Sequence, residues 1–168
     1  MNAWSRKFTA LIATLACTAA LAAGGRSVEA FDRDTWRGLK SGLAKPAVVV
    51  FSATWCPNCP GVINDLAAQL RQRKLDATLM AVVTDVAPGE QDEALLHDKH
   101  YQNVSRLFAF DGQAPALRHG VDPSWRGVVP YVVFLSATGA PPIVVTGTPD
   151  AKAVDAWAKG FKPARSSP

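Results

Sequence analysis

Two cysteines, Cys56 and Cys59, stand three positions apart at the junction between an apolar run and a stretch with helical periodicity. The apolar run, residues 47–53, predicts a buried strand, and the apolar positions after Cys59 recur on one helical face. The N-terminus of a helix carries partial positive charge, which stabilises a thiolate and lowers the pKa of the first cysteine. The motif therefore predicts reversible disulfide chemistry at a strand-to-helix turn.

The segment after the cysteines predicts a helix that packs on a sheet. Pro57 and Pro60 fall within the first four residues of this helix, where backbone N–H groups have no intrahelical acceptor to lose. A second apolar run, residues 77–83, predicts another strand buried on both faces, so that strand, helix and strand form a parallel βαβ unit. The apolar positions that share one face of the helix are Val62, Ile63, Leu66, Ala67 and Leu70.

The flanking segments complete an α/β pattern. Before the motif, residues 27–31 predict a first strand, and Asp32 or Asp34 is expected to cap a short helix that follows it. Near the C-terminus we expect a hairpin of residues 131–135 and 143–145, and then a closing helix within residues 149–160. A chain of 168 residues, 48% of them hydrophobic, suffices for one domain with a real core.

The N-terminal segment has the pattern of a secretory signal peptide. Arg6 and Lys7 precede a long apolar run without charge, which predicts a signal over residues 1–22. We expect cleavage after Ala22, with Ala30 as the other site preceded by a small-residue pattern. The apolar run is shorter than the about 20 residues that a spanning helix needs. We therefore expect an exported, periplasmic protein, and the alternative is tethering to the inner membrane by an uncleaved signal.

Removal of this signal changes what the charge and the cysteines imply. The net charge falls from +4 to +2, because the signal carries Arg6 and Lys7 and no acidic residue. No basic run with interleaved aromatic residues occurs, so we expect no nucleic-acid partner. The two remaining cysteines are too few and too closely spaced for a structural disulfide framework, which favours an active pair.

The histidines do not predict a metal site. His97 and His100 are the candidate ligands to join the two cysteines, but their spacing departs from the common zinc patterns. We expect both on a solvated helix face, and His119 has no identifiable partner in the sequence. The prediction is no metal, and no cofactor beyond the redox-active disulfide.

Residues 48–59, which read VVVFSATWCPNC, resemble the active-site segment of the thioredoxin superfamily. Residues 127–131, GVVPY, resemble the loop of that family in which a cis-proline lies beside the cysteines and leads into the terminal hairpin. This resemblance implies an α/β fold of three layers, with a central mixed β-sheet and helices on both faces.

The resemblance also implies roles for particular residues. Cys56 would be an exposed nucleophile that attacks a substrate disulfide, and Cys59 would resolve the mixed disulfide. Substrate contacts would come from the residue before the motif and from the proline loop, and two residues would support the motif. The implied substrate-binding residues are Trp55, Val129 and Pro130, and the supporting residues are Pro57 and Asn58.

The segment between Asp85 and Pro130 is much longer than the about dozen residues that a parallel crossover needs. We expect an insert, residues 86–127, between the βαβ unit and the C-terminal ββα unit. The domain would span residues 23–161, and residues 162–168 would be a flexible tail. The long connection and the export signal resemble the exported TlpA-like branch, which includes thiol reductases of cytochrome c maturation.

The sequence departs from these families at the residues that assist proton transfer. Val50 aligns with the buried aspartate of thioredoxins, and Val62 aligns with an acidic residue that many TlpA-like reductases carry. Asn58 stands where strong oxidants have a histidine between the cysteines. An intermediate reduction potential follows as a hypothesis.

Three functions are consistent with these observations. The first is an exported reductase of periplasmic protein disulfides that receives electrons from a membrane-embedded thiol donor. The second is a periplasmic disulfide donor, which runs the same chemistry in reverse. The third is a thioredoxin-fold chaperone or metal-delivery module without catalysis. The sequence leaves open the direction, the substrates, the role of the insert and the oligomeric state.

Overall fold

The computed structural model describes residues 26–161. The strands in chain order are β1 (Val28–Phe31), β2 (Ala47–Ser52), β3 (Thr78–Val83), β4 (Arg106–Phe110), β5 (Tyr131–Leu135) and β6 (Ile143–Thr146). The helices are α1 (Arg33–Ser41), α2 (Cys59–Gln72), α3 (Asp92–His97), α4 (Ala114–Val121) and α5 (Ala151–Ala158), with a 3-10 turn, η1 (Lys99–Tyr101). The expected signal peptide, residues 1–22, and the expected tail, residues 162–168, lie outside the described residues.

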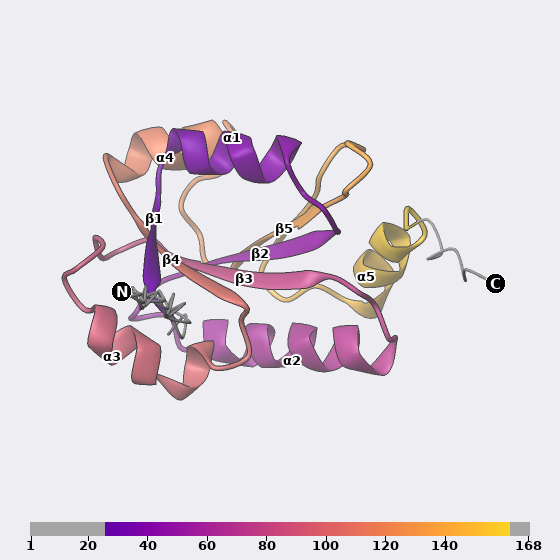
Figure 1. The fold of residues 1–168 in the computed structure, drawn as a ribbon, viewed down its shortest axis with the longest axis horizontal. Coiled ribbons are helices and arrows are strands. Elements are labelled where there is room, and N and C mark those ends of the chain that lie inside the picture. The colour runs from indigo at the N-terminus through magenta and orange to yellow at the C-terminus, as the bar shows by residue number, and fades with distance from the viewer. Residues whose placement is uncertain (1–25, 162–168) are drawn as a thin grey trace, which may run out of the picture.

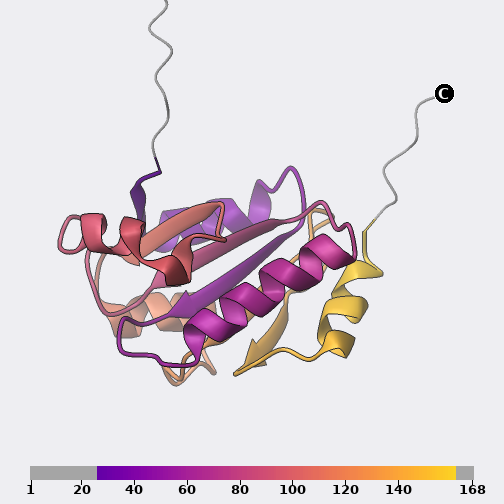
Figure 2. The same cartoon turned by 90° about the horizontal axis from the view of Figure 1, so that it is seen from below.

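The strands form one mixed sheet with the order β1-β4-β3-β2-β5-β6. The first four strands in this order run parallel, whereas β5 is antiparallel to β2 and β6 is antiparallel to β5. Helices α1 and α4 lie on one face of the sheet and α2 and α3 on the other (Figure 1). From below, α2 crosses this second face and α5 lies beside it (Figure 2). The expected three-layer sandwich with a central mixed sheet is confirmed.

Strand β2 is apolar on both sides because it lies between two cores. Val48 and Val50 pack against α2 and α5, while Val49 and Phe51 pack against α1 and α4. Side chains alternate between the two faces of a strand, so a strand covered on both faces reads as a continuous apolar run. This burial explains the apolar run before the cysteines, and it fixes the position of β2, whose end leads into the motif.

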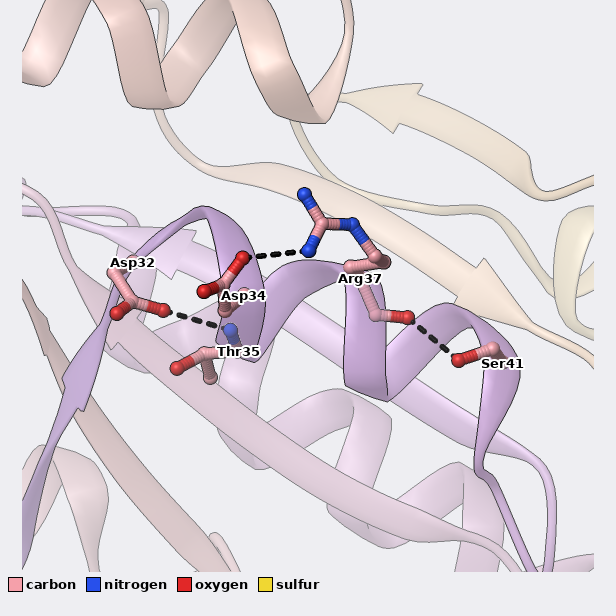
Figure 3. A network of polar contacts seen from close by, with 5 residues as sticks. All are labelled: Asp32, Asp34, Thr35, Arg37 and Ser41. Carbon is pink, nitrogen blue, oxygen red and sulfur yellow. Dashed lines mark hydrogen bonds and ion pairs between the residues drawn. The ribbon is translucent and has the colours of Figure 1, made fainter.

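Helix α1 begins at a side-chain cap. The Asp32 carboxylate accepts a hydrogen bond from the backbone N–H of Thr35 at 2.7 Å, so Asp32, and not Asp34, is the N-cap. Asp34 instead pairs with Arg37 on the exposed side of the helix, and the Ser41 hydroxyl donates to the Arg37 carbonyl (Figure 3). The cap holds the pKa of Asp32 below its usual range through the backbone hydrogen bond from Thr35.

The expected insert, residues 86–127, contributes a strand to the middle of the sheet. It contains α3, η1, β4 and α4, and β4 pairs in parallel with β1 on one side and β3 on the other. This strand was not expected from the sequence. The sequence feature that marks this strand is the short apolar run from Leu107 to Phe110. A run of this length is compatible with either a buried strand or part of a buried helix.

The other elements match their expected positions within one or two residues at most ends. The closing helix α5 is shorter than residues 149–160, and the Asp150 carboxylate sets its start by accepting from the backbone N–H of Ala153 at 2.8 Å. Cleavage after Ala30 would remove most of β1, which forms the sheet edge beside β4. Within residues 26–161, no helix is both long enough and apolar enough to span a bilayer.

Candidate active site

Cys56 and Cys59 form a disulfide in the turn between β2 and α2, with their Cα atoms 5.6 Å apart. Both cysteines are buried: Cys56 is 6% exposed and Cys59 is 1% exposed. The expectation of an exposed Cys56 is therefore wrong for this oxidised state. The two residues pack with Ala53 and Val129 in one small apolar cluster. The large apolar side chain that is exposed beside the motif is that of Trp55, at 68%.

The turn that carries the motif is held by the end of the neighbouring strand. Asp85, just after β3, accepts hydrogen bonds from the backbone N–H of Thr54 at 3.0 and 3.1 Å and from its hydroxyl at 2.5 Å. The backbone N–H of Cys56 donates to the carbonyl of Ala53 at 3.0 Å. These bonds fix the direction of the chain between β2 and the first cysteine.

Helix α2 begins at Cys59, so Cys56 lies one turn before the first helical residue. Asn58 occupies the N-cap position but makes no side-chain capping bond, and Pro60 stands in the first turn where a missing N–H costs nothing. Pro57 lies in the exposed turn before the helix, so the expectation that it falls within the first helical residues is wrong. No acidic residue is present in the first helical turn, so the free N–H groups of α2 supply uncompensated positive partial charge near the cysteines.

The loop before β5 lies against the cysteines. The peptide bond between Val129 and Pro130 is cis, in agreement with the resemblance. Val129 packs on the cysteine pair, and the carbonyl of Pro130 accepts a hydrogen bond from the backbone N–H of Gly147 at 2.8 Å. Gly127 has a φ of 86°, and a Cβ there would lie 3.3 Å from the Arg118 side chain, so the loop entry requires glycine.

A cluster of aromatic and polar side chains on the α1 and α4 side of the sheet supports this loop. Trp125 stacks on Tyr131 with ring centroids 4.5 Å apart, and its indole N–H donates to the carbonyl of Val128 at 2.9 Å. The Tyr131 hydroxyl donates to Asp122 at 2.6 Å, and Ser124 donates to the same carboxylate through its backbone and its hydroxyl. These hydrogen bonds, led by that from Tyr131, lower the pKa of Asp122, while burial raises the pKa of Tyr131.

A buried hydroxyl pair, which sequence reasoning missed, lies next to the motif. Ser52, at the end of β2, is 1% exposed, and its hydroxyl is 3.2 Å from that of Tyr101 in η1. Burial raises the pKa of Tyr101, and the hydrogen bond with Ser52 opposes this shift in part. Only the fold joins these residues, because they are far apart in the chain and neither is unusual for its segment.

The positions that lack acids are apolar in the structure as well. Val50 and Val62 belong to the same buried cluster, in which Val50 is fully buried on the α2 side of β2. His97 lies on α3 and His119 on α4, both exposed, whereas His100 lies in η1 and lines the hollow beside Cys56. Among residues 26–161, no group of three or more His, Cys, Asp or Glu side chains gathers as a metal site.

This arrangement can perform thiol-disulfide exchange. Two cysteines within disulfide distance can hold and release an electron pair, and the helix N-terminus stabilises the thiolate that attacks. Trp55 and Val128, at 68% and 56% exposed, present apolar surface close to the motif and the proline loop.

The chain was compared with known proteins. No protein-family model matches the sequence, and no curated protein matches it. The fold is similar to that of a secreted disulfide oxidoreductase from Mycobacterium tuberculosis, homologous to E. coli DsbE, with a TM-score of 0.51 and 17% identity. That superposition covers 82% of this chain and 96% of the other. A thioredoxin-related protein from Neisseria meningitidis serogroup B gives a TM-score of 0.49 and 20% identity over 72% and 87% of the two chains.

The similarity to the mycobacterial structure shows that the chain has a thioredoxin-like fold. The likeness covers most of both chains, and the six-stranded sheet described above lies within the fold that it shows.

Proposed function

We propose that this protein is an exported thiol-disulfide oxidoreductase that reduces protein disulfides in the periplasm. The single observation that carries the proposal is the Cys56–Cys59 disulfide at the start of α2, against which the Val129–Pro130 loop packs. A buried disulfide with one apolar, exposed neighbour fits a reaction in which the partner protein docks first and then reaches the sulfur. The mycobacterial protein of similar fold is itself a secreted disulfide oxidoreductase.

In the proposed cycle, the reduced protein begins with two thiols. The Cys56 thiolate attacks a substrate disulfide, so that a Cys56–substrate disulfide forms and one substrate thiolate leaves. The Cys59 thiolate then attacks Cys56, which releases the second substrate thiolate and leaves the intramolecular disulfide. Two electrons pass to the substrate, and a membrane-embedded dithiol protein returns them to the Cys56–Cys59 pair.

Substrate binding is assigned to the surface around the motif. Trp55 is proposed to contact the partner protein, because a large apolar side chain that is mostly exposed beside the reactive bond favours docking. Val129 and Pro130 would form the binding loop: Pro130 has no N–H, and this leaves the adjacent backbone of Val129 free to pair with an extended substrate segment. Pro57 and Asn58 shape the turn between the cysteines.

The proposal extends to location and branch. A signal peptide cleaved after Ala22 would leave β1 intact and place the domain, residues 23–161, outside the cytoplasm. The TlpA-like branch is supported by the inserted α3-η1-β4 segment between β3 and the proline loop. A reductase of this branch would act in cytochrome c maturation or a related pathway of thiol reduction.

Trapping tests the exchange reaction. The Cys59→Ser variant, expressed in the native host, should accumulate mixed disulfides through Cys56 that dissociate on treatment with a reductant. The Cys56→Ser variant is the matched control and should capture nothing. Failure of Cys59→Ser to capture any partner by a reducible bond, with purified protein also unable to reduce a model protein disulfide, would remove the proposed function.

Equilibration with glutathione tests the direction. We expect a reduction potential well below that of strong oxidants, because Asn58 supplies no cation between the cysteines. A potential near about −120 mV would instead identify a disulfide donor. Partners caught by Cys59→Ser would then be proteins that await oxidation.

A further inference from the structure

A hollow of about 230 Å³ opens beside Cys56, between the active-site turn and the α3-η1 segment. We call it the Cys56 hollow. It brings residues from the end of β2 and from the motif together with residues that are more than 40 positions away in the chain. The lining residues used below are Ser52, Trp55, Cys56, Asp98, His100 and Tyr101.

His100 is fixed in this hollow by Asp98. The Asp98 carboxylate caps η1 by accepting from the backbone N–H of His100 at 2.9 Å. The same carboxylate oxygen lies 3.1 Å from Nδ1 of the His100 ring. One acidic side chain therefore holds both the backbone and the imidazole, and it selects the tautomer with the proton on Nδ1 and a free Nε2.

Tyr101 anchors the same turn to the core. Its ring is 3% exposed, and its hydroxyl pairs with the buried hydroxyl of Ser52, which is four residues before Cys56. This hydroxyl pair ties η1 to the end of β2 at the floor of the hollow. The position of His100 relative to the motif follows from this anchor together with the Asp98 cap.

The charged and titratable groups around Cys56 come from each element that packs near it. Asp98, His100 and Tyr101 come from the α3-η1 segment. Asp85 comes from the end of β3, and its carboxylate accepts hydrogen bonds from the backbone N–H and the hydroxyl of Thr54. The proline loop contributes only apolar Val129, and the first turn of α2 has no acidic residue. Burial raises the pKa of Tyr101, so its hydroxyl stays protonated at neutral pH.

Of the residues that line the hollow, His100 is the one that combines a ring nitrogen able to accept a proton, Nε2, with a carboxylate partner at the other ring nitrogen. We infer that His100, oriented by Asp98, accepts the proton of the Cys56 thiol and stabilises the resulting thiolate as its counter-cation. The inference rests on the proposed function and names the group that supports it. The insert would thus supply, from outside the motif, the proton acceptor and the positive charge that Val50, Val62 and Asn58 do not provide.

In the proposed step a proton moves from Cys56 to His100 before the sulfur attacks. The Cys56 thiol loses its proton to His100, directly or through one water, which leaves a thiolate beside an imidazolium. The thiolate attacks a substrate disulfide, one sulfur–sulfur bond forms as another breaks, and the substrate thiolate that leaves takes up the proton. The electrons that reduce the substrate come from the Cys56–Cys59 dithiol, so His100 carries protons only.

The test measures the thiol itself and not turnover. Reduced protein is treated with iodoacetamide between about pH 5 and 9, and modification of Cys56 is followed by mass spectrometry in wild type and in His100→Gln. Because the His100 side chain is 55% exposed, solvent screens its charge. We expect the rate at about pH 6 to fall about two- to fivefold in His100→Gln, the range for exposed ionic contacts.

Two further variants separate charge from structure. His97→Gln is the matched control, because His97 is exposed on α3 and does not line the hollow, and its rate should equal that of wild type. His100→Lys keeps a positive charge where histidine loses it, so at about pH 8 its Cys56 should react faster than wild type. Circular dichroism checks that each variant is folded.

The outcomes distinguish this inference from the proposed function. A His100→Gln profile that coincides with wild type, a His97→Gln profile that shifts equally, or a His100→Lys rate no higher than wild type at about pH 8 overturns the role of His100. Each of these results leaves exchange by Cys56 and Cys59 intact, as trapping with Cys59→Ser would still report it. Loss of trapping with the expected alkylation profiles would overturn the function while the His100–Cys56 coupling stands.

Discussion

Val50→Asp places a carboxyl group at the position that aligns with the buried aspartate of thioredoxins, and it tests whether the apolar core next to the motif tolerates a charge. Val50 is 0% exposed, and its neighbours in the sheet are Ala81 and Val132. The helix side of the site is equally apolar, since Val62 and Ile63 belong to the same buried cluster. A carboxylate placed there would lose its hydration without gaining a cation, so its neutral form would be strongly favoured.

The magnitude follows from the burial. A fully buried carboxyl group has its pKa raised by about 3 units or more from about 3.9, and each unit corresponds to about 1.4 kcal/mol. The folded pKa then exceeds the unfolded pKa, so the protonated side chain carries no ionisation penalty below about pH 4. Stability is lost as the pH rises towards the folded pKa near about 7, where the added loss reaches about 4 kcal/mol.

Val50→Asn provides the matched control, because asparagine has the size and polarity of aspartic acid but does not ionise. Urea unfolding of the oxidised proteins, followed by tryptophan fluorescence, should give similar free energies of unfolding for the two variants at about pH 4. At about pH 8 the Val50→Asp protein should be less stable by about 4 kcal/mol. Equal pH dependence of the two variants would refute the reasoning, since it would mean that water or a cation reaches residue 50.

The remaining predictions concern the neighbouring contacts. Ser52→Ala and Tyr101→Phe should each destabilise the protein by about 1–3 kcal/mol in urea unfolding, but the double variant by less than their sum, and additive losses would exclude a buried hydroxyl pair. The lowered pKa of Asp122 stabilises the fold above about pH 4, so acid titration of Asp122→Asn should lack the loss that wild type shows as the pH falls further. Trp55→Ala should slow reduction of a protein disulfide but change the free energy of unfolding by less than about 0.5 kcal/mol, and an equal rate would remove Trp55 from the docking surface.

The elements that the sequence predicted well are those whose pattern arises from local burial. Strand β2 is buried at every position, and apolar from Ala47 to Phe51, because both of its faces are covered. Helix α2 repeats its apolar positions because one side meets the sheet. Strand β4 went unnamed because its partners, β1 and β3, are far away in the chain. A short apolar run does not reveal whether it will find such partners.

In the candidate site, too, the features contained in a short stretch of sequence were predicted, and those that depend on distant residues were not. Cys56 and Cys59 were evident from their spacing, and the resemblance of residues 127–131 pointed to Pro130, since both signals are contained in a few consecutive residues. The burial of Cys56 is not evident from the sequence, because part of the packing around it comes from Val129, on a loop that is distant in sequence.

The sequence by itself determined the type of chemistry that this chain can perform, because a cysteine pair at the start of a helix is a local arrangement of neighbouring residues. Only the tertiary structure decided what surrounds that pair. The pairing of Ser52 with Tyr101 and the placement of His100 in the hollow that Cys56 also lines depend on the packing of the α3-η1 segment against the end of the sheet. The Asp85 contact with the active-site turn depends on the pairing of β3 with β2. Such contacts join residues through space, so no local pattern records them.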